Sequence, residues 1–282
     1  MSIKTVLITG CSSGIGHALM NEFLLQGYRV YASARSLSSF TGMEHPRLRT
    51  FTLDVNHQAD IDSAAAAIEQ DSGYLSVLVN NAGFAAMGPV SELSQEKLQQ
   101  QFATNVFAPV ALTQTFLPLL QKNKAAGPAQ VVNIGSVSGV VTTPFSGAYC
   151  ATKAALHSLS DALRMELKPF NIDVITVQPG SIESEFGNNS LKNLADLISE
   201  DSLYAPLKKN IEARAMASQQ NPTSAADLAK ILVGKLQKNP KAELPIGNGS
   251  RSLPLVKWVL STKMLDSILR RKFGLDTLKK HK

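Results

Sequence analysis

Short apolar runs alternate with longer amphipathic stretches along most of the chain. Runs of about four to eight apolar and β-branched residues, bounded by turn residues, predict buried strands. They lie at 5–10, 29–34, 49–55, 75–82, 129–136 and 171–180, with a weaker seventh at 242–248. Apolar residues at helical spacing predict helices near 15–26, 57–71, 94–122, 148–168 and 224–238.

This alternation predicts an α/β fold, a single doubly wound parallel sheet of the Rossmann type with helices on both faces. The first 180 residues contain no internal repeat and no break in composition. We therefore expect one dinucleotide-binding catalytic domain over 1–250. Ligands of such sheets bind beyond the carboxyl ends of the strands. Polar and turn residues that fall at these ends are Gly10, Asp54, Asn80, Asn81, Ser136 and Pro179.

The positive charge of the chain is concentrated at its C-terminal end. The net charge is +6, but residues 251–282 hold nine Lys or Arg and two Asp, and the other 250 residues sum to −1. Residues 252–273 also place apolar side chains on one helical stripe, which predicts a basic, amphipathic, helical C-terminal extension. It either packs on this domain or a second subunit, or lies on an anionic membrane surface with Trp258 at the interface. With so few aromatic residues in the extension, we expect no nucleic-acid partner.

Composition is that of an ordinary globular protein, with 44% hydrophobic and 18% charged residues. The two cysteines, Cys11 and Cys150, cannot form a disulfide framework, which favours a reducing compartment. The first residues, 1–10, resemble a buried strand and not a signal peptide. No apolar run approaches the roughly 20 residues of a transmembrane helix. We therefore expect a cytoplasmic protein, with membrane association through 251–282 as the alternative, and no metal site, because the five histidines lack ligand spacing.

A glycine-rich turn, "TGCSSGIG" at 9–16, follows the first predicted strand and opens the first predicted helix. Glycines permit a tight turn and close approach of the backbone, and a helix N-terminus attracts anions. This context favours dinucleotide binding over plain turn chemistry, although the spacing differs from the commoner G-x-G-x-x-G. The residues of this turn expected to bind the cofactor are Gly10, Ser12, Ser13, Gly14, Ile15 and Gly16.

The end of the second strand indicates which cofactor is bound. NAD-binding folds place a carboxylate there for the adenosine ribose. Here the sequence is "YASARS", with no acid and with Arg35 available to a 2′-phosphate. We therefore expect NADP(H), with Arg35 and Ser33 contacting the phosphate.

Tyr149 and Lys153 are four residues apart in a predicted helix and so share one face. A nearby ammonium favours the phenolate, which would lower the pKa of the tyrosine and make it a usable general acid or base. On this segment alone, a solvated lysine beside a half-buried tyrosine is the better explanation of the pattern.

Seven motifs together decide between these interpretations. The chain resembles the short-chain dehydrogenase/reductases over about residues 3–180, in "TGCSSGIG", "LDV" (53–55), "NNAG" (80–83), Asn105 in "ATNVFAP", "NIGSVSG" (133–139), "YCATK" (149–153) and "VQPG" (177–180). The resemblance implies hydride transfer between NADP(H) and a carbonyl or alcohol. Many NADP-dependent members carry Lys or Arg where this chain has Ser13.

The family pattern implies a role for each matching residue. Tyr149 is the general acid or base, Ser136 holds the substrate carbonyl, Lys153 grips the nicotinamide ribose, and Asn105 holds a water in a proton relay. Further cofactor contacts are implied at Asp54, Val55, Asn81, Ala82, Gly83, Pro179, Gly180 and Ile182. The family also implies a substrate lid, at about 181–220, and a homo-oligomer, dimer or tetramer.

The pocket predicted from this pattern is apolar and suits a bulky hydrophobic ketone or aldehyde. Its candidate lining residues are Phe84, Met87, Val140, Phe145, Phe186, Leu191 and Leu194. The first 35 residues resemble most the branch acting on steroids, retinoids and acyl-dihydroxyacetone phosphate. Two alternatives stay open: a 3-ketoacyl-thioester reductase, and a regulator that senses NADPH without catalysis.

Overall fold

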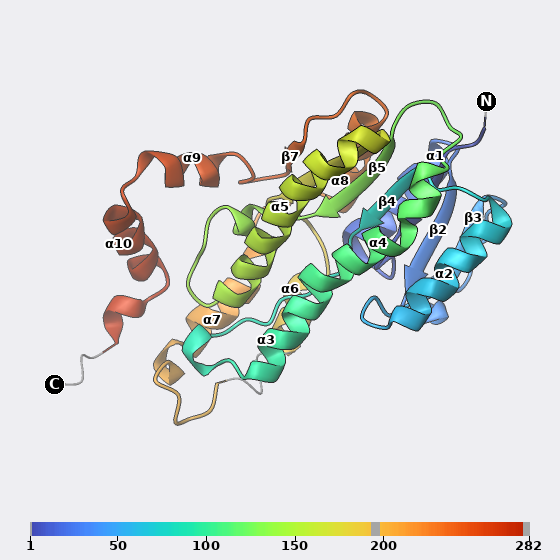
Figure 1. Ribbon diagram of the computed structural model, residues 1–282. Helices are drawn as coiled ribbons and strands as arrows, with labels where there is room; N and C mark the ends of the chain where they lie inside the picture. The colour runs from blue at the N-terminus through green and yellow to red at the C-terminus, as the bar shows by residue number, and fades with distance from the viewer. Residues whose placement is uncertain (1, 193–197, 279–282) are drawn as a thin grey trace.

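A seven-stranded parallel sheet forms the centre of the molecule, in the order β3-β2-β1-β4-β5-β6-β7. The computed structural model describes residues 2–192 and 198–278 (Figure 1). The strands are β1 (Thr5–Ile8), β2 (Arg29–Ala34), β3 (Leu48–Thr52), β4 (Val77–Asn80), β5 (Ala129–Ile134), β6 (Ile172–Pro179) and β7 (Glu243–Ile246). All seven predicted strands, including the weak one at 242–248, are thus confirmed.

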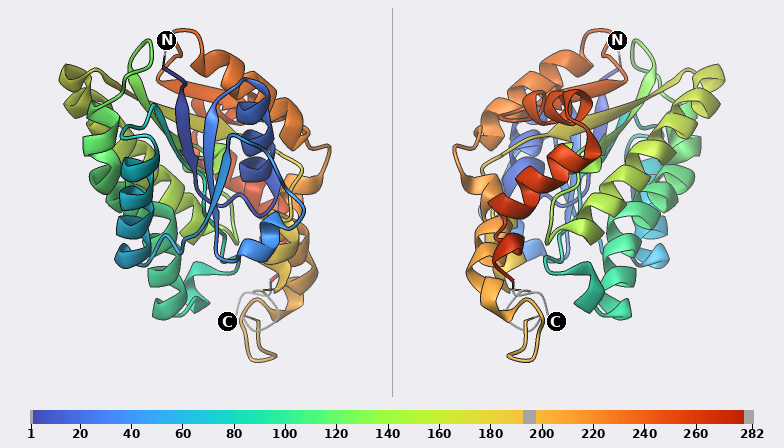
Figure 2. Two further views of the ribbon diagram at one scale, coloured as in Figure 1. Left: turned by 90° about the vertical axis from the view of Figure 1, so that its right-hand side faces the viewer. Right: turned by 90° about the vertical axis from the view of Figure 1, so that its left-hand side faces the viewer.

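Two layers of helices cover the sheet, because its strands are apolar on both faces (Figure 2). On one face Phe23 of α1 and Leu232 of α8 pack against β1 and β6. On the other, Ile61 of α2 and Phe116 of α4 pack against the opposite side chains of the same strands. The helices are α1 (Gly14–Leu25), α2 (Gln58–Asp71), α3 (Gln95–Phe102), α4 (Ala108–Gln121), α5 (Gly147–Leu167) and α8 (Ala225–Leu236).

Helices α3 and α4 are joined by a π-helical turn, Ala103–Phe107, into one helical rod. This rod, Gln95–Gln121, is long and apolar enough to cross a membrane by length and composition alone, contrary to the sequence-based expectation. Half of its most apolar stretch is buried inside the protein. Leu112, Phe116 and Leu120 pack on the sheet, so the apolar length is that of a core helix.

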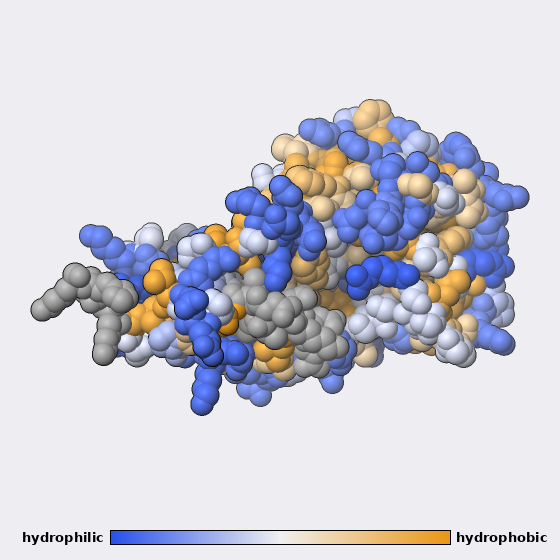
Figure 3. Space-filling model, turned by 90° about the horizontal axis from the view of Figure 1, so that it is seen from below, coloured by the Kyte–Doolittle hydropathy of each residue, from blue (hydrophilic) through white to orange (hydrophobic). Residues whose placement is uncertain are grey.

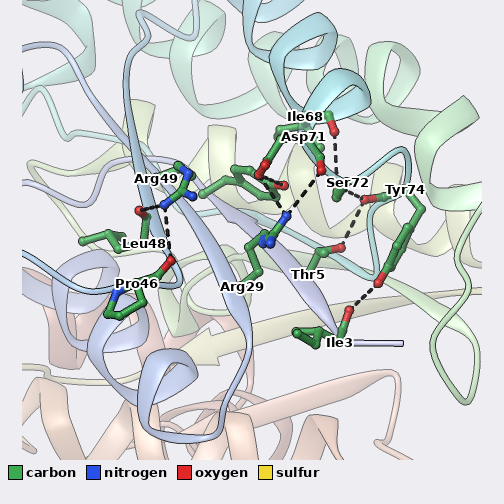
Figure 4. Close-up of polar contacts among 11 residues, drawn as sticks. Ile3, Thr5, Arg29, Pro46, Leu48, Arg49, Ile68, Asp71, Ser72 and Tyr74 are labelled. Carbon is green, nitrogen blue, oxygen red and sulfur yellow. Dashed lines mark hydrogen bonds and ion pairs between the residues drawn. The ribbon is translucent and has the colours of Figure 1, made fainter. Parts of the chain in front are cut away.

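The amino ends of the strands are closed by a polar network, at the edge opposite the glycine turn (Figure 4). Arg29 forms an ion pair with Asp71, and the Tyr74 hydroxyl donates to the carbonyl of Ile3. The Thr5 hydroxyl donates to the carbonyl of Tyr74. These contacts fix the register at one end of the sheet and leave the other end for a site.

The segment after β6 forms helices α6 (Phe186–Lys192) and α7 (Lys208–Ala215) over the carboxyl ends of the strands. After β7 the chain continues into α9 (Ser252–Val259) and α10 (Thr262–Lys272), which form an arm at the left of Figure 1. The single stripe predicted over 252–273 is therefore wrong. Ser261 has extended backbone and accepts a hydrogen bond from the Met264 amide, so it ends one helix and caps the next.

Candidate active site

A cavity of about 1280 Å³ opens at the carboxyl ends of the strands, under α7 and the arm. It gathers residues that are far apart in the sequence, from the glycine turn to α10. The predicted site residues that line it are Gly10, Ser12, Ser13, Gly14, Ile15, Arg35, Asp54, Val55, Asn81, Ala82, Gly83, Ser136, Tyr149, Lys153, Pro179, Gly180 and Ile182. Gly16, Ser33 and Asn105 do not line it.

The glycine turn takes a backbone path that needs glycine. Gly10 and Gly14 have φ of 72° and 56°, in the left-handed region that L side chains rarely adopt. A Cβ on Gly16 would lie 2.2 Å from the carbonyl oxygen of Gly10, so Gly16 contributes close packing and no cavity surface. Helix α1 has no acidic residue in its first turn and no side-chain cap at Ser13. Its amino end therefore presents backbone N–H groups to the cavity.

Sequence reasoning missed Thr9, which ties this turn to the end of β4. The Thr9 hydroxyl accepts from the backbone amides of Asn81 and Ala82, both at 3.1 Å. The Asn81 side chain donates in return to the carbonyls of Thr9 and Gly10, at 2.8 and 3.0 Å. Both amide protons of Asn81 are thus used inside the protein, so its side chain shapes the cavity floor.

Arg35 is exposed at the end of β2 and lines the cavity. Within residues 2–192 and 198–278 it has no carboxylate at ion-pair distance, which leaves its charge available to an anion. The expectation for Ser33 is corrected. Its side chain is fully buried, and its hydroxyl faces the carbonyl of Ile8 at 3.5 Å, away from the cavity.

Ser136 follows β5, and its hydroxyl accepts from the amide of Ser138 at 3.0 Å. The hydroxyl keeps its proton to donate, and it interacts with the Tyr149 phenol across the cavity. The backbone amide of Ser136 donates to Nε2 of His157 at 3.3 Å. His157 fills the space beneath the turn, where a Cβ on Gly135 would lie 2.3 Å from Nε2. Sequence reasoning gave His157 no role; its spacing of i+4 from Lys153 was the available signal.

Tyr149 and Lys153 lie on one face of α5, as the spacing predicts, and both are buried. The Lys153 ammonium lies 5.8 Å from the centre of the Tyr149 ring and donates to the carbonyl of Ile134 at 2.7 Å. That bond pins the lysine against the end of β5. The phenol, the ammonium and the Ser136 hydroxyl thus share one wall of the cavity.

The electrostatics of this wall differ from the sequence-based expectation. Burial raises the pKa of the Tyr149 phenol to about 12, and the effects that lower it are the interaction with Ser136 and the charge of Arg214, not that of Lys153. Burial also lowers the pKa of Lys153 to about 8. The phenol is consequently neutral at pH 7, a state that donates a proton and does not accept one.

Asn105 is buried in the π-helical turn behind this wall. Its Oδ1 accepts from the amide of Phe84, and its Nδ2 donates to the carbonyl of Phe84 and to the Thr152 hydroxyl. Oδ1 keeps a second lone pair. It lies close to Gly83, since a Cβ on that residue would be 3.0 Å from it. The residue braces the Phe84 loop against α5, and the predicted water relay stays a prediction.

Comparison with known proteins gives the family. The family model for short chain dehydrogenases matches residues 4–195. The probable short-chain type dehydrogenase/reductase VdlC of Helicobacter pylori is 32% identical, with 94% of this chain and 96% of that protein covered. The chain belongs to the short-chain dehydrogenase/reductase family. An NADPH-dependent 3-dehydrocapnine reductase of Ornithobacterium rhinotracheale is 32% identical, with 94% and 96% covered.

A solved structure agrees at the level of the whole chain. A short-chain dehydrogenase from Streptomyces avermitilis superposes with a TM-score of 0.79 at 27% identity, and 99% of each chain is covered. The protein is accordingly an NAD(P)-dependent oxidoreductase with a Rossmann-type fold.

The cavity of this dehydrogenase/reductase fits such a cofactor. The left-handed glycines leave open backbone for a pyrophosphate, the amino end of α1 supplies N–H donors, and Arg35 supplies a cation. When bound, the nicotinamide supplies or accepts a hydride. Across the described ranges no group of three or more His, Cys, Asp or Glu is placed to hold a metal ion.

The substrate side of the cavity is only partly what the sequence predicted. Phe84, Met87 and Phe186 line it, whereas Val140, Phe145 and Leu191 do not, and Leu194 lies outside the described residues. Phe145 is buried in a cluster beside the cavity, where its ring contacts those of Tyr204 and Phe273. The lining residues that sequence reasoning missed include Arg214 of α7, Leu265, Ile268, Leu269 and Lys272 of α10, and Phe273 directly after it.

Proposed function

We propose that this protein is an NADPH-dependent reductase that interconverts a ketone or aldehyde and an alcohol on a hydrophobic substrate, with Tyr149 as the general acid or base. The observation that carries the proposal is the meeting of Ser136, Tyr149 and Lys153 in one cavity with an open glycine turn. A regulator that only senses NADPH would need the turn but not the three side chains together.

The wall suits reduction of a carbonyl. The Ser136 hydroxyl, which accepts from the Ser138 amide, can donate its proton to the carbonyl oxygen and hold it. As a hydride reaches the carbonyl carbon, charge develops on the oxygen, and the neutral Tyr149 phenol donates its proton there. The phenolate that remains is favoured by the interaction with Ser136 and by the charge of Arg214, the two effects that lower its pKa.

The preference for NADPH rests on Arg35 and on the absence of an acid at the end of β2. A guanidinium pairs with a 2′-phosphate through charge-assisted hydrogen bonds. The relative from Ornithobacterium rhinotracheale is described as NADPH-dependent, which supports the same preference. A hydrophobic substrate is supported by the apolar side chains of Met87, Phe186 and Leu269.

Following NADPH absorbance with a panel of hydrophobic ketones, aldehydes and 3-ketoacyl thioesters tests the proposal. We expect turnover of ketones or aldehydes with long apolar chains. Turnover confined to thioesters would identify the ketoacyl-thioester alternative. NADPH binding without turnover of any compound would favour the sensor and overturn the proposal.

A further inference from the structure

Arg214 is a cation in the substrate side of the cavity that takes no direct part in the proton transfer. It lies on α7, is partly buried and lines the cavity. Its Nε donates to the Thr143 hydroxyl and its Nη2 to the Ser146 hydroxyl, both at 2.9 Å. No carboxylate in the described part of the chain pairs with it. The guanidinium is therefore oriented by two hydroxyls while its charge stays unneutralised.

The surroundings of Arg214 indicate what would neutralise it. Its Nη2 bonds the hydroxyl of Ser146, the residue at the start of α5 three positions before Tyr149, so the guanidinium lies near the reacting end of the cavity. Burial lowers its pKa, a sign that the charged form is poorly solvated there. Beyond it the walls are apolar, with Met87, Phe186 and Leu269 among the lining residues. An oxyanion brought in by the ligand would remove this penalty, and the planar fork of arginine matches such a group.

We propose that Arg214 binds an anionic group of the substrate, a carboxylate or a phosphate-type oxyanion, and that the substrate is an amphiphile carrying this group, the reacting carbonyl and an apolar chain. The inference rests on the proposed function and narrows its substrate class. The competing role is electrostatic, in which Arg214 only adjusts the pKa of Tyr149. The two roles differ because the first depends on the charge of the substrate and the second does not.

Binding of unreactive probes tests the site without turnover. Calorimetric titration of the NADPH-loaded protein with octanoate, octyl phosphate and neutral octanamide should show tighter binding of the anions. Arg214→Met should weaken anion binding by about 10- to 100-fold, the usual value of a hydrogen bond to a charged group, and leave octanamide unchanged. Thr143 and Ser146 can still bond each other at 2.9 Å, so the fold should survive. Arg214→Lys should restore part of the affinity, and Arg271→Met, outside the cavity, should change nothing.

Rates separate the two roles of Arg214. For 5-oxodecanoate and its methyl ester, Arg214→Met should lower kcat/KM for the acid at least about tenfold more than for the ester, and this difference should lie mainly in KM. An equal loss of kcat/KM for both compounds would overturn the anion site in favour of an effect on Tyr149. If the anions bind through Arg214 but no ketone is reduced, the proposed function fails alone. If ketones are reduced but octanoate and octanamide bind equally, the anion site fails alone.

A second inference comes independently from the arm, residues 251–278 of the described chain. Seven of the 17 large apolar side chains that the structure exposes lie here, including Trp258 at 84%, Val259 at 65% and Leu255 at 58%. Among them stand exposed Arg251, Lys263 and Arg271. Seen from below, the arm protrudes from the body with apolar patches between hydrophilic side chains (Figure 3).

We infer that the exposed face of α9 and α10 binds an anionic lipid surface. A second copy of the chain is the other candidate, but two arms face to face would bring two strongly basic surfaces together. Acidic lipid complements the charge and accepts the apolar side chains. Leu253, Val256 and Ile268 line the cavity and are also exposed, so the apolar side chains of the arm continue into the cavity wall.

Vesicle co-sedimentation tests this surface. The full chain should bind vesicles of phosphatidylcholine with phosphatidylglycerol, bind pure phosphatidylcholine far less, and dissociate as salt rises. The variant W258S/V259S should lose most of the binding, whereas Phe170→Ser, at an exposed aromatic on another part of the surface, should keep it. Equal binding to both vesicles, no binding, or a dimer that W258S/V259S dissociates in light scattering would each overturn the inference.

Discussion

Single residues in the site are held by the backbone of neighbouring elements. The Ser138 amide fixes the Ser136 hydroxyl, and the Ile134 carbonyl fixes the Lys153 ammonium. With these bonds in place, the serine still has a proton to donate and the lysine keeps its positive charge. The phenol of Tyr149 is left between them, neutral at pH 7 because burial raises its pKa.

Tyr149→Phe removes the proton donor and nothing else. We expect carbonyl reduction to fall about 100- to 10,000-fold, the usual contribution of a positioned general acid. NADPH affinity should change little, because the turn, Arg35 and Lys153 remain. Steady-state rates and NADPH fluorescence titration measure the two quantities. Retention of most of the activity on a good substrate would show that the assigned acid is wrong.

Arg35→Asp tests the choice of cofactor. The substitution replaces the cation by an anion that repels a 2′-phosphate and can accept from a ribose hydroxyl. We expect NADPH affinity to fall by at least about tenfold, the loss of a charge-assisted hydrogen bond, and NADH use to improve. Dissociation constants of both cofactors, in wild type and variant, are the measurement. A wild-type protein that binds both equally would contradict the assignment.

At the scale of elements, helix α5 organises the catalytic wall. Tyr149, Lys153 and His157 follow one another at intervals of four on one face, so a single helix places the acid, the cation and the support of the Ser136 turn. Burial and the charge of Lys153 lower the pKa of His157 to about 4, and it accepts a hydrogen bond as the neutral ring.

This pKa predicts how stability depends on pH. His157 takes up a proton at about pH 6.5 in the unfolded state and only near pH 4 in the folded state. Its contribution to the free energy of unfolding is therefore fully present above pH 6.5 and is lost as the pH falls from 6.5 towards 4. His157→Gln keeps an acceptor without titrating. Between pH 7 and 5 the wild type should lose about 1 kcal/mol more unfolding free energy than the variant. Urea unfolding at both pH values measures this, and parallel losses would contradict it.

What the sequence predicted follows from local pattern. The strands and helices are periodic, and Tyr149 and Lys153 are near neighbours on one helix, so both were accessible. The role of His157 was not, since it depends on two glycines of a distant turn, Gly135 and Gly139, that leave room for the ring. The raised pKa of Tyr149 was missed because desolvation depends on the assembled walls. Arg214 was missed for the same reason: no spacing links α7 to Thr143.

At the scale of the whole molecule, the arm and the catalytic cavity form one unit. Helix α10 closes the substrate side with Leu265 and Leu269, and its end is held by Phe273, which is 9% exposed. The Phe273 ring packs edge-on against Phe145 at 6.4 Å, next to the helix that carries Tyr149. A substrate chain therefore contacts the far end of the polypeptide while its carbonyl is near the catalytic wall.

Phe273→Ala should weaken this attachment without disturbing the chemistry. Removing a buried aromatic ring costs about 3–5 kcal/mol when the gap stays open, and here α10 can relax by leaving the cavity wall. We expect KM for decan-2-one to rise several-fold, because losing the contact of one or two chain carbons costs about 1 kcal/mol of binding free energy. The kinetics of butan-2-one, whose chain is too short to reach α10, should stay unchanged. Amide hydrogen exchange in α10 should accelerate. Phe170→Ala, at an exposed ring, is the matched control, and a parallel change for the long and short ketones would show that the arm does not contact the substrate chain.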